Sequence, residues 1–181
     1  MYTGLSSYPP ALELHYLAPP SPPHTPSPPY PPPSPPIPPP VTILSGPSVT
    51  SDTYVRNGYS ARGGYSYGWW DGPFTTPSGS TSAILIKFDL SNTGLASVSD
   101  ASFHYHIDNS GDTATIQELA VTWDDQTVTY DSLPWDTSSW RDASVFYNAV
   151  SGSTGWQSTD VTASVNAFLD GSRTNNGCAA S

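Results

Sequence analysis

The distribution of proline constrains this chain more than any other feature of its sequence. Seventeen of its 21 prolines lie within residues 1–40, in runs such as Pro31-Pro32-Pro33 and Pro38-Pro39-Pro40. Proline fixes φ near −65° and lacks an amide donor, so such runs favour extended polyproline II. We therefore predict that residues 1–40 form a disordered Pro-rich spacer outside any core, with a stiff part about 60–70 Å long over residues 19–40.

The charge of the chain and the length of its apolar runs exclude two classes of partner. It has 5 Lys and Arg against 15 Asp and Glu, for a formal net charge of −10. Binding of nucleic acid depends on cationic side chains that displace counterions, so we expect no nucleic-acid partner. The longest strongly apolar run, Ala83–Phe88, contains Lys87. Since a spanning helix needs ~20 apolar residues, we expect no membrane partner either.

Residues 41–181 have the size of one domain, and their pattern is typical of strands. Over residues 83–90 the even positions are apolar while Lys87 and Asp89 lie opposite them, which predicts a half-buried strand. Residues 101–107 alternate in the same way. Shorter alternating patterns predict strands over residues 119–123 and 145–149.

One segment has helical spacing instead. Val161, Val165 and Phe168 recur at intervals that place them on one helix face, with Asp160 as the predicted N-cap and Gly171 as the stop. Antiparallel strands joined by Gly- and Ser-rich turns, together with one short helix, predict an all-β sandwich.

Four ordered motifs connect this pattern to a known family. They are Asp52-Thr-Tyr-Val-Arg56, Leu85-Ile-Lys-Phe-Asp-Leu-Ser91, Val121-Thr-Trp-Asp-Asp-Gln-Thr-Val-Thr-Tyr130 with Leu133-Pro134, and Asp160-Val-Thr162 followed by Asn175-Asn-Gly177. The series resembles the DNRLRE domain, also classified as carbohydrate-binding module family 96, over residues 48–181. The resemblance implies a jelly-roll β-sandwich without catalytic activity, attached to polysaccharide lyases or to surface and matrix proteins, with alginate as a ligand class of some members. The Ser-Pro-Pro tract is similar in composition to spacers of pherophorin-like algal matrix glycoproteins.

Both ends of the chain depart from a complete secreted module. Family members usually continue past the Asn-Gly turn with further strands, whereas only Cys178-Ala-Ala-Ser181 follows here. We therefore expect residues 41–181 to be truncated at the C-terminus, with an exposed sheet edge, and to belong to a larger multidomain chain. Met1–Ala18 has no Lys or Arg and no continuous apolar core, so no signal peptide is visible.

A loop rich in aromatic residues and arginine is the candidate ligand site. The apolar faces of sugar rings pack on aromatic rings, and guanidinium groups bind carboxylates in a bidentate fork. The resemblance adds a shallow surface of basic and tyrosine side chains, which corresponds to Arg56, Arg62, Tyr65 and Lys87. The predicted ligand-binding residues are Arg56, Tyr59, Arg62, Tyr65, Tyr67, Trp69 and Lys87. The net charge keeps a neutral glucan or galactan open beside a uronic-acid polymer.

Metal sites have weaker signals. The densest acidic clusters, residues 108–112 and 124–125, lack the Asp-x-Asp-x-Asp-Gly pattern of a calcium loop. We therefore expect no cofactor, with a structural calcium ion as the alternative. The spacing of His104 and His106 on one strand face suits zinc. Because no Cys or third His lies nearby in the sequence, we expect a solvent-facing pair instead.

The sequence contains no nucleophile elbow, zinc-protease motif or phosphate loop, so we expect no enzyme activity. The predicted function is a non-catalytic polysaccharide-binding module of an extracellular protein, secreted or in a cell wall or matrix. Two alternatives stay open. One is a structural matrix or adhesion glycoprotein without sugar affinity, and the other is a polysaccharide lyase fragment that uses a pair such as His104 and Tyr130.

Overall fold

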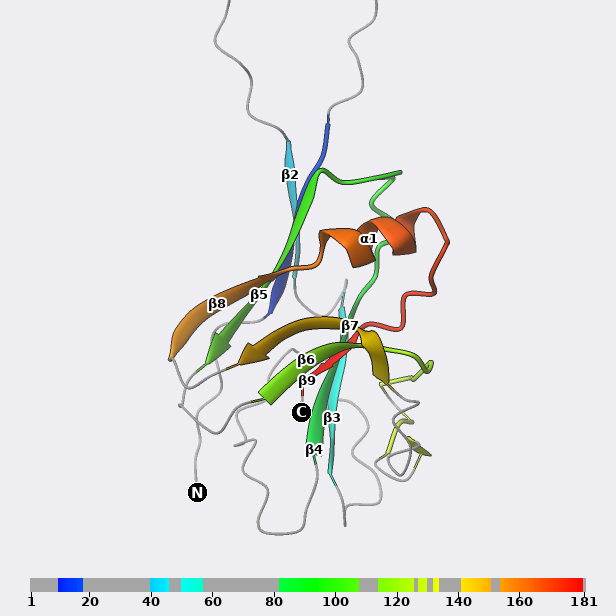
Figure 1. Cartoon of the computed structure of the whole chain (residues 1–181). Coiled ribbons are helices and arrows are strands. Elements are labelled where there is room, and N and C mark those ends of the chain that lie inside the picture. The colour runs from blue at the N-terminus through cyan, green and yellow to red at the C-terminus, as the bar shows by residue number, and fades with distance from the viewer. Residues whose placement is uncertain are drawn as a thin grey trace, which may run out of the picture.

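The described part of the chain forms two antiparallel sheets and one helix (Figure 1). The computed structural model describes residues 10–17, 40–45, 50–56, 82–107, 114–125, 127–129, 132–133, 141–150 and 154–180. A four-stranded sheet fills the upper part of Figure 1 and a five-stranded sheet the lower part. The predicted all-β class with two sheets and one helix is confirmed.

The four-stranded sheet has the order β2-β1-β5-β8. Its strands are β1 (Ala11–His15), β2 (Val41–Ser45), β5 (Asp100–Ile107) and β8 (Gly155–Asp160). In the centre of this sheet, Leu12 of β1 pairs with Leu44 on one side and with Phe103 on the other. All three are buried, so the even positions of β1 face the core.

Strand β1 corrects the predicted boundary at residue 40. The segment Ala-Leu-Glu-Leu-His alternates apolar and polar residues and contains no proline, so its amides are free to pair with both neighbouring strands. Leu14 is completely buried and Leu12 almost so. The prediction that residues 1–40 contribute to no core is therefore wrong for Ala11–His15. The remaining Pro-rich residues, 18–39, lie outside the described residues, but the residues on either side of them meet: the Tyr16 amide donates to the Pro40 carbonyl oxygen at 3.3 Å, and His15 pairs with Val41. The prediction that this segment holds its two ends about 60–70 Å apart is therefore wrong.

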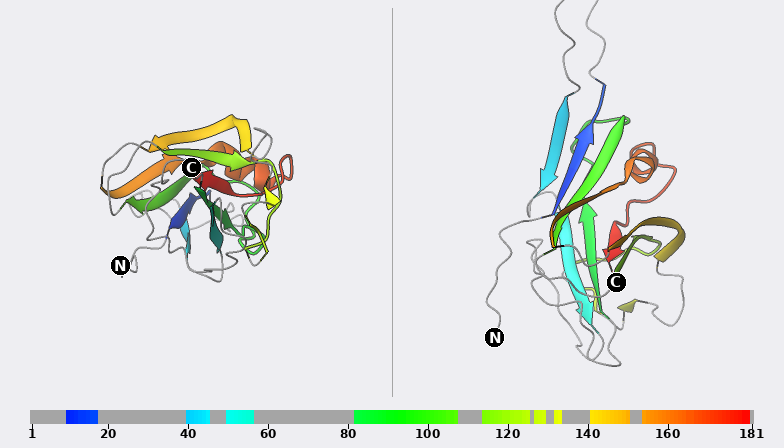
Figure 2. Two further views of the ribbon diagram at one scale, coloured as in Figure 1. Left: turned by 90° about the horizontal axis from the view of Figure 1, so that it is seen from below. Right: turned by 60° about the vertical axis from the view of Figure 1, so that its left-hand side comes forward.

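The five-stranded sheet has the order β3-β4-β9-β6-β7. Its strands are β3 (Thr50–Arg56), β4 (Ser82–Phe88), β6 (Ala114–Leu119), β7 (Arg141–Val150) and β9 (Cys178–Ala180). Strand β9 pairs with β4 on one side and with β6 on the other, inside the sheet (Figure 2). The predicted exposed edge at the C-terminal residues is therefore wrong for Cys178–Ala180, because the edges of this sheet are β3 and β7.

Three of the predicted strands correspond to β4, β5 and β7, and the fourth is displaced. Residues 119–123 were expected to be a strand, but the strand is β6, which ends at Leu119. Leu119 and Trp123 are both buried in one cluster that Val121 also contacts. Their apolar alternation therefore comes from a loop that folds over the sheet, not from a strand.

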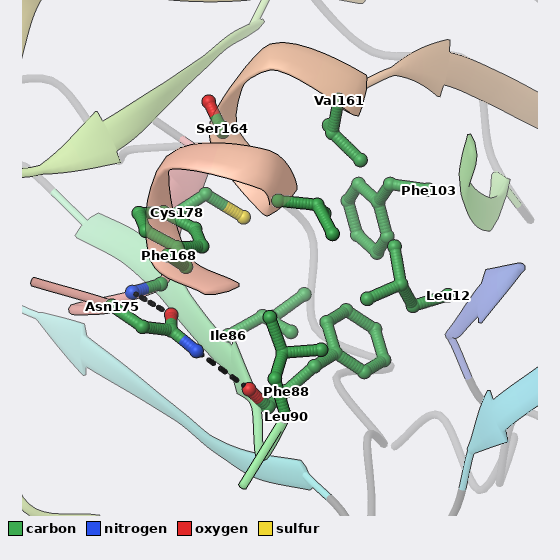
Figure 3. Close-up of a pocket in the computed structure, with 12 residues that line it drawn as sticks. Leu12, Ile86, Phe88, Leu90, Phe103, Val161, Ser164, Phe168, Asn175 and Cys178 are labelled. Atoms are coloured by element: carbon green, nitrogen blue, oxygen red, sulfur yellow. Dashed lines mark hydrogen bonds between the residues drawn. The ribbon is translucent and has the colours of Figure 1, made fainter. Parts of the chain in front are cut away.

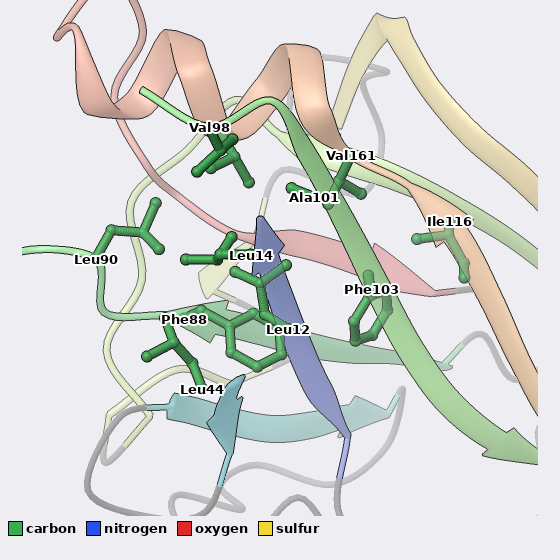
Figure 4. Packing of buried hydrophobic residues seen from close by; sticks show 11 residues of the cluster. Leu12, Leu14, Leu44, Phe88, Leu90, Val98, Ala101, Phe103, Ile116 and Val161 are labelled. Carbon is green, nitrogen blue, oxygen red and sulfur yellow. The ribbon is translucent and has the colours of Figure 1, made fainter. Parts of the chain in front are cut away.

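The first hydrophobic core lies between the sheets and beneath the helix (Figure 4). Figure 4 shows Leu12 and Phe103 of the four-stranded sheet facing Phe88 at the end of β4. The rings of Phe88 and Phe103 meet edge to face, with centroids 5.7 Å apart. This packing fixes which side of the four-stranded sheet points inward.

A second core lies on the opposite side of the five-stranded sheet. Ala83 and Leu85 of β4 contact Leu119, Trp123 and Val128 there, and Ala83 and Leu85 are 1% and 0% exposed. The prediction that β4 is half-buried is therefore wrong. The loop after β6 covers the side of β4 that Lys87 shares with Ala83 and Leu85, so both sides of this strand pack against a hydrophobic core.

The helix α1 (Thr162–Leu169) follows β8 directly and confirms the predicted helical segment. Its N-cap is Val161, one residue after the predicted Asp160. The Asp160 carboxylate nevertheless accepts a 2.8 Å hydrogen bond from the Thr162 amide, so it still satisfies one free amide of the first turn. Gly171 has φ of 75° just after the helix, as the predicted stop requires.

Candidate functional site

The candidate site is the side of the four-stranded sheet that points away from the first core, which we call the outer face. Since neighbouring residues of a strand point to opposite sides, the buried positions of each strand identify the outward ones. The outward residues are Ala11, Glu13 and His15 of β1, Val41, Ile43 and Ser45 of β2, Asp100, Ser102, His104 and His106 of β5, and Trp156, Ser158 and Asp160 of β8.

An exposed tryptophan lies on the β8 side of the outer face. Trp156 is 51% exposed, while Thr159, which points inward from the same strand, is buried. Its register partner on β5 is His106, and the two rings meet edge to face at 5.4 Å between centroids and 77° between planes. The imidazole therefore supports one edge of the indole and leaves much of the ring surface open to a ligand.

A carboxylate between two histidines lies nearer the centre of the outer face. Glu13 accepts a 2.8 Å hydrogen bond from His15 Nε2 through its Oε1 atom. His104 Nε2 lies 3.1 Å from Oε2 of the same side chain. The histidines approach from opposite ends, since His15 follows Glu13 on β1 and His104 lies diagonally across on β5. All three side chains are about one-third exposed, so the expected solvent-facing position of His104 is only partly right.

Other oxygen groups border this centre. Asp100 lies opposite His15 in the register, and Asp160 lies opposite Ser102. Hydrogen bonds from the Thr162 side chain and amide to Asp160 lower the pKa of its carboxyl group. Asp160 therefore stays ionised at neutral pH, at the end of β8 where the chain enters α1.

Most of the ligand-binding residues predicted from the sequence lie outside the described residues. These are Tyr59, Arg62, Tyr65, Tyr67 and Trp69. The structure describes the backbone of Arg56 at the end of β3 but not its side chain, and it describes the whole of Lys87. The side chains of Tyr54, Trp69 and Trp70, and the residue Tyr130, also lie outside the described part.

Lys87 does not lie with Arg56. In the β3–β4 register Arg56 pairs with Ser82, whereas Lys87 pairs with Ser51. Five residues of strand at ~3.3 Å each separate the two positions by roughly 16 Å. The Lys87 ammonium instead lies 5.3 Å from the centroid of the Trp123 ring, over the second core. Because the side chain of Arg56 lies outside the described residues, the inclusion of both residues in one ligand site stays a prediction.

Metal binding finds no support in the described part of the chain. No group of three or more His, Cys, Asp or Glu side chains there is placed to hold an ion. Asp124 accepts a hydrogen bond from the Thr127 hydroxyl and closes a turn with its own carbonyl oxygen. His15 and His104 are separated by the Glu13 carboxylate that both contact. Residues 108–112, the other predicted acidic cluster, lie outside the described residues.

A cavity between α1 and the two sheets is too small to be the ligand site (Figure 3). Leu12, Ile86 and Phe103 are among its mostly apolar lining residues. Its volume of about 40 Å³ holds only a few water molecules, each of which needs roughly 10–15 Å³ of such space. Asn175 at its rim is occupied, because its side chain donates to the Phe88 carbonyl and accepts from the Gly177 amide. A sugar ring does not fit here.

A buried polar network behind this cavity is structural. Glu118 is 3% exposed, and its Oε2 accepts hydrogen bonds from Arg173 at 2.8 Å and from the Ser164 hydroxyl at 2.9 Å. Cys178 lies opposite Glu118 in the register of β6 and β9. Burial, with a smaller contribution from the Glu118 charge, raises the pKa of the Cys178 thiol to about 12. Such a thiol is not a nucleophile at neutral pH.

Sequence reasoning missed Trp156, Glu13 and His15 as site residues. Glu13 and His15 lie in the Pro-rich segment, where composition hid a short alternating pattern. Trp156 is the second residue of β8, a strand that was not predicted. The signal that could have revealed this strand is a period of two, in which Trp156 and Ser158 point outward and Thr159 points inward.

Comparison with protein-family models, curated proteins and solved structures finds no match to this chain. The resemblance to the DNRLRE domain therefore stays a prediction that rests on the four motifs. Among the described residues, no helix is both long enough and apolar enough to cross a membrane.

Proposed function

We propose that this chain is a non-catalytic polysaccharide-binding module of an extracellular protein, and that the outer face of its four-stranded sheet receives the ligand. The observation that carries the proposal is Trp156, half-exposed on a sheet and supported by His106. An indole ring in this position offers the apolar surface on which the C–H face of a sugar ring packs.

The polar groups around Trp156 suit the same ligand. Hydroxyl-rich chains need hydrogen-bond acceptors and donors, and Ser158, Glu13 and Ser102 provide them on the same side of the sheet. Three adjacent strands carry these groups on one side of the sheet. A sheet face of this kind suits the side of a long polymer more than a single small molecule.

The remaining parts of the proposal rest on the sequence. The jelly-roll connectivity, the membership in carbohydrate-binding module family 96 and the extracellular location follow from the motif series. Two packed antiparallel sheets are compatible with a jelly roll. The predicted loop site with Arg62 and Tyr65 is a second part of the same proposal, to be tested separately from Trp156.

Affinity electrophoresis in native gels that contain one polymer each tests the function. We expect retardation by at least one of alginate, pectin, cellulose ethers or sulfated galactan, and loss of that retardation in Trp156→Ala. Circular dichroism shows whether each sample is folded. A folded wild-type chain that no polymer retards contradicts the proposal, and release of shortened products from any polymer favours the lyase alternative.

The second candidate is a structural matrix or adhesion domain, and one observation favours it. Val41 and Ile43 are 45% and 62% exposed on the edge strand β2. Exposed aliphatic residues at a sheet edge suit contact with another protein chain. Retention by neighbouring matrix proteins without retention by any polysaccharide would select this candidate.

A further inference from the structure

The placement of charge in the fold points to the chemical class of the ligand. We propose that the outer face binds an uncharged polysaccharide and discriminates against polymers that carry a carboxylate on each sugar. This inference rests on the proposed function, because it specifies the ligand of the same face. It differs from the ligand class implied by the resemblance, which includes alginate.

The first argument is where the basic residues lie. Lys87 and Arg141 belong to β4 and β7 of the five-stranded sheet, and Arg173 lies between α1 and β9. Two of these are engaged away from the outer face, Lys87 over the Trp123 ring and Arg173 with Glu118. Arg56 is in β3 of the same five-stranded sheet. No Lys or Arg lies on any of the four strands that form the outer face.

The second argument is that the outer face carries carboxylates. Its titratable groups are Glu13 and His15 from β1, Asp100, His104 and His106 from β5, and Asp160 from β8. Strand β2 contributes only Val, Thr, Ile, Leu and Ser. A uronate chain laid over these strands would bring its own carboxylates toward three others, and these four strands carry no guanidinium or ammonium group to pair with them.

The third argument is that the carboxylates of the outer face do not weaken the binding of a neutral sugar. Hydroxyl groups donate to carboxylates, and hydrogen bonds to a charged acceptor are the stronger kind. His15 hydrogen-bonds one oxygen of Glu13 and His104 Nε2 lies 3.1 Å from the other, so the carboxylate is confined from two directions before a ligand arrives. A preorganised acceptor beside a stacking ring is suited to a polymer of uncharged sugars.

The test compares polymers that share a backbone and differ in charge. Hydroxyethyl cellulose and carboxymethyl cellulose form one pair, and methyl-esterified and de-esterified homogalacturonan form another. Affinity electrophoresis of the full chain at pH 7.5 and low salt gives an apparent Kd for each. We expect the neutral member of at least one pair to bind, and its charged counterpart to bind about tenfold or more weakly. Added NaCl should narrow the difference, because salt screens the repulsion between carboxylates.

Three variants connect the result to the outer face. Trp156→Ala should abolish binding of the neutral polymer, and Trp156→Phe should restore part of it. Ser158→Lys adds a cation two residues from Trp156 and should strengthen binding of the charged polymer by several-fold. Thr122→Ala changes an exposed side chain in the loop over the other sheet and should leave both Kd values unchanged.

The possible outcomes separate the inference from the function on which it rests. Equal or tighter binding of the charged polymers, lost in Trp156→Ala, overturns the uncharged class and keeps the binding function. Neutral binding that Trp156→Ala does not change overturns the assignment to the outer face. A folded chain that binds neither member of either pair, nor any other polymer, overturns both proposals.

Discussion

The indole Nε1–H of Trp123 donates a 2.7 Å hydrogen bond to the carbonyl oxygen of Asn176. The two residues belong to different motifs of the series that resembles the DNRLRE domain. Asn176 forms a second bond just before the same loop, from its side-chain amide to the carbonyl oxygen of Leu119, the last residue of β6, at 3.2 Å. Hydrogen bonds therefore connect the end of β6 and the loop after it to the turn before β9, over the second core.

This relationship makes Trp123 a structural residue, in contrast to Trp156. Trp123→Phe removes the indole donor and leaves the buried Asn176 carbonyl without it, so we expect a loss of about 1–3 kcal/mol in the free energy of unfolding. Urea denaturation followed by circular dichroism measures this loss. Trp156→Phe is the control, expected to change stability by less than about 0.5 kcal/mol because Trp156 is exposed. Equal losses in both variants would contradict the assignment.

The turn before β9 requires glycine for two reasons. Gly177 has φ of 79°, and a Cβ atom there would collide with the Ile86 carbonyl oxygen and the Lys87 Cβ of the neighbouring strand. Gly177→Ala should therefore cost more than the ~1–2 kcal/mol of a left-handed conformation alone. Gly94→Ala provides the match, since Gly94 has φ of 68° and open space around it. If both variants lose the same stability, the close approach of β9 to β4 is not the constraint.

Removing one partner of the buried Glu118–Arg173 pair should lower the free energy of unfolding more than replacing both partners does. Arg173→Ala removes the guanidinium from the buried Glu118 carboxylate, which keeps the hydrogen bond from the Ser164 hydroxyl. We expect a loss of about 2–4 kcal/mol, somewhat below that of a fully buried pair because the guanidinium is 30% exposed. In a double-mutant cycle, the variant that combines Glu118→Gln with Arg173→Met should lose less unfolding free energy than the sum of the losses in Glu118→Gln alone and Arg173→Met alone. Additive losses would mean that the two side chains act independently.

The residues that carry the family resemblance are largely those of the scaffold. Trp123, Asn176 and Gly177 hold the loop and turn together, and Asp160 binds the first amide of α1. Such residues leave a strong sequence signal because tight turns and caps admit few residue types. They predict the class of fold well for this reason, but they do not identify the surface that meets a ligand.

The parts of the fold that could not be predicted depend on distant partners. β4, β5 and α1 have enough residues for a period of two or of 3.6 to be visible. β1 and β9 have five and three residues, and each is a strand because two neighbours from elsewhere in the chain supply its hydrogen bonds. The candidate site depends on the same pairing, since Glu13 meets His104 only when β1 lies beside β5.

Acid should weaken the junction between β8 and α1. The hydrogen bonds from Thr162 lower the pKa of Asp160 in the folded chain, so the unfolded chain binds its proton more readily as the pH falls. The stability that this carboxylate contributes is present above its ordinary pKa of about 3.9 and is lost as the pH falls through the lower, folded value. Because the side chain is exposed, we expect a contribution of only about 0.5–1 kcal/mol, typical of a helix cap. Asp160→Asn keeps an acceptor but does not titrate, so its free energy of unfolding should fall less than that of the wild type between pH 6 and pH 3. Urea denaturation at several pH values measures both profiles, and parallel profiles would show that Asp160 does not contribute to the acid sensitivity of the fold.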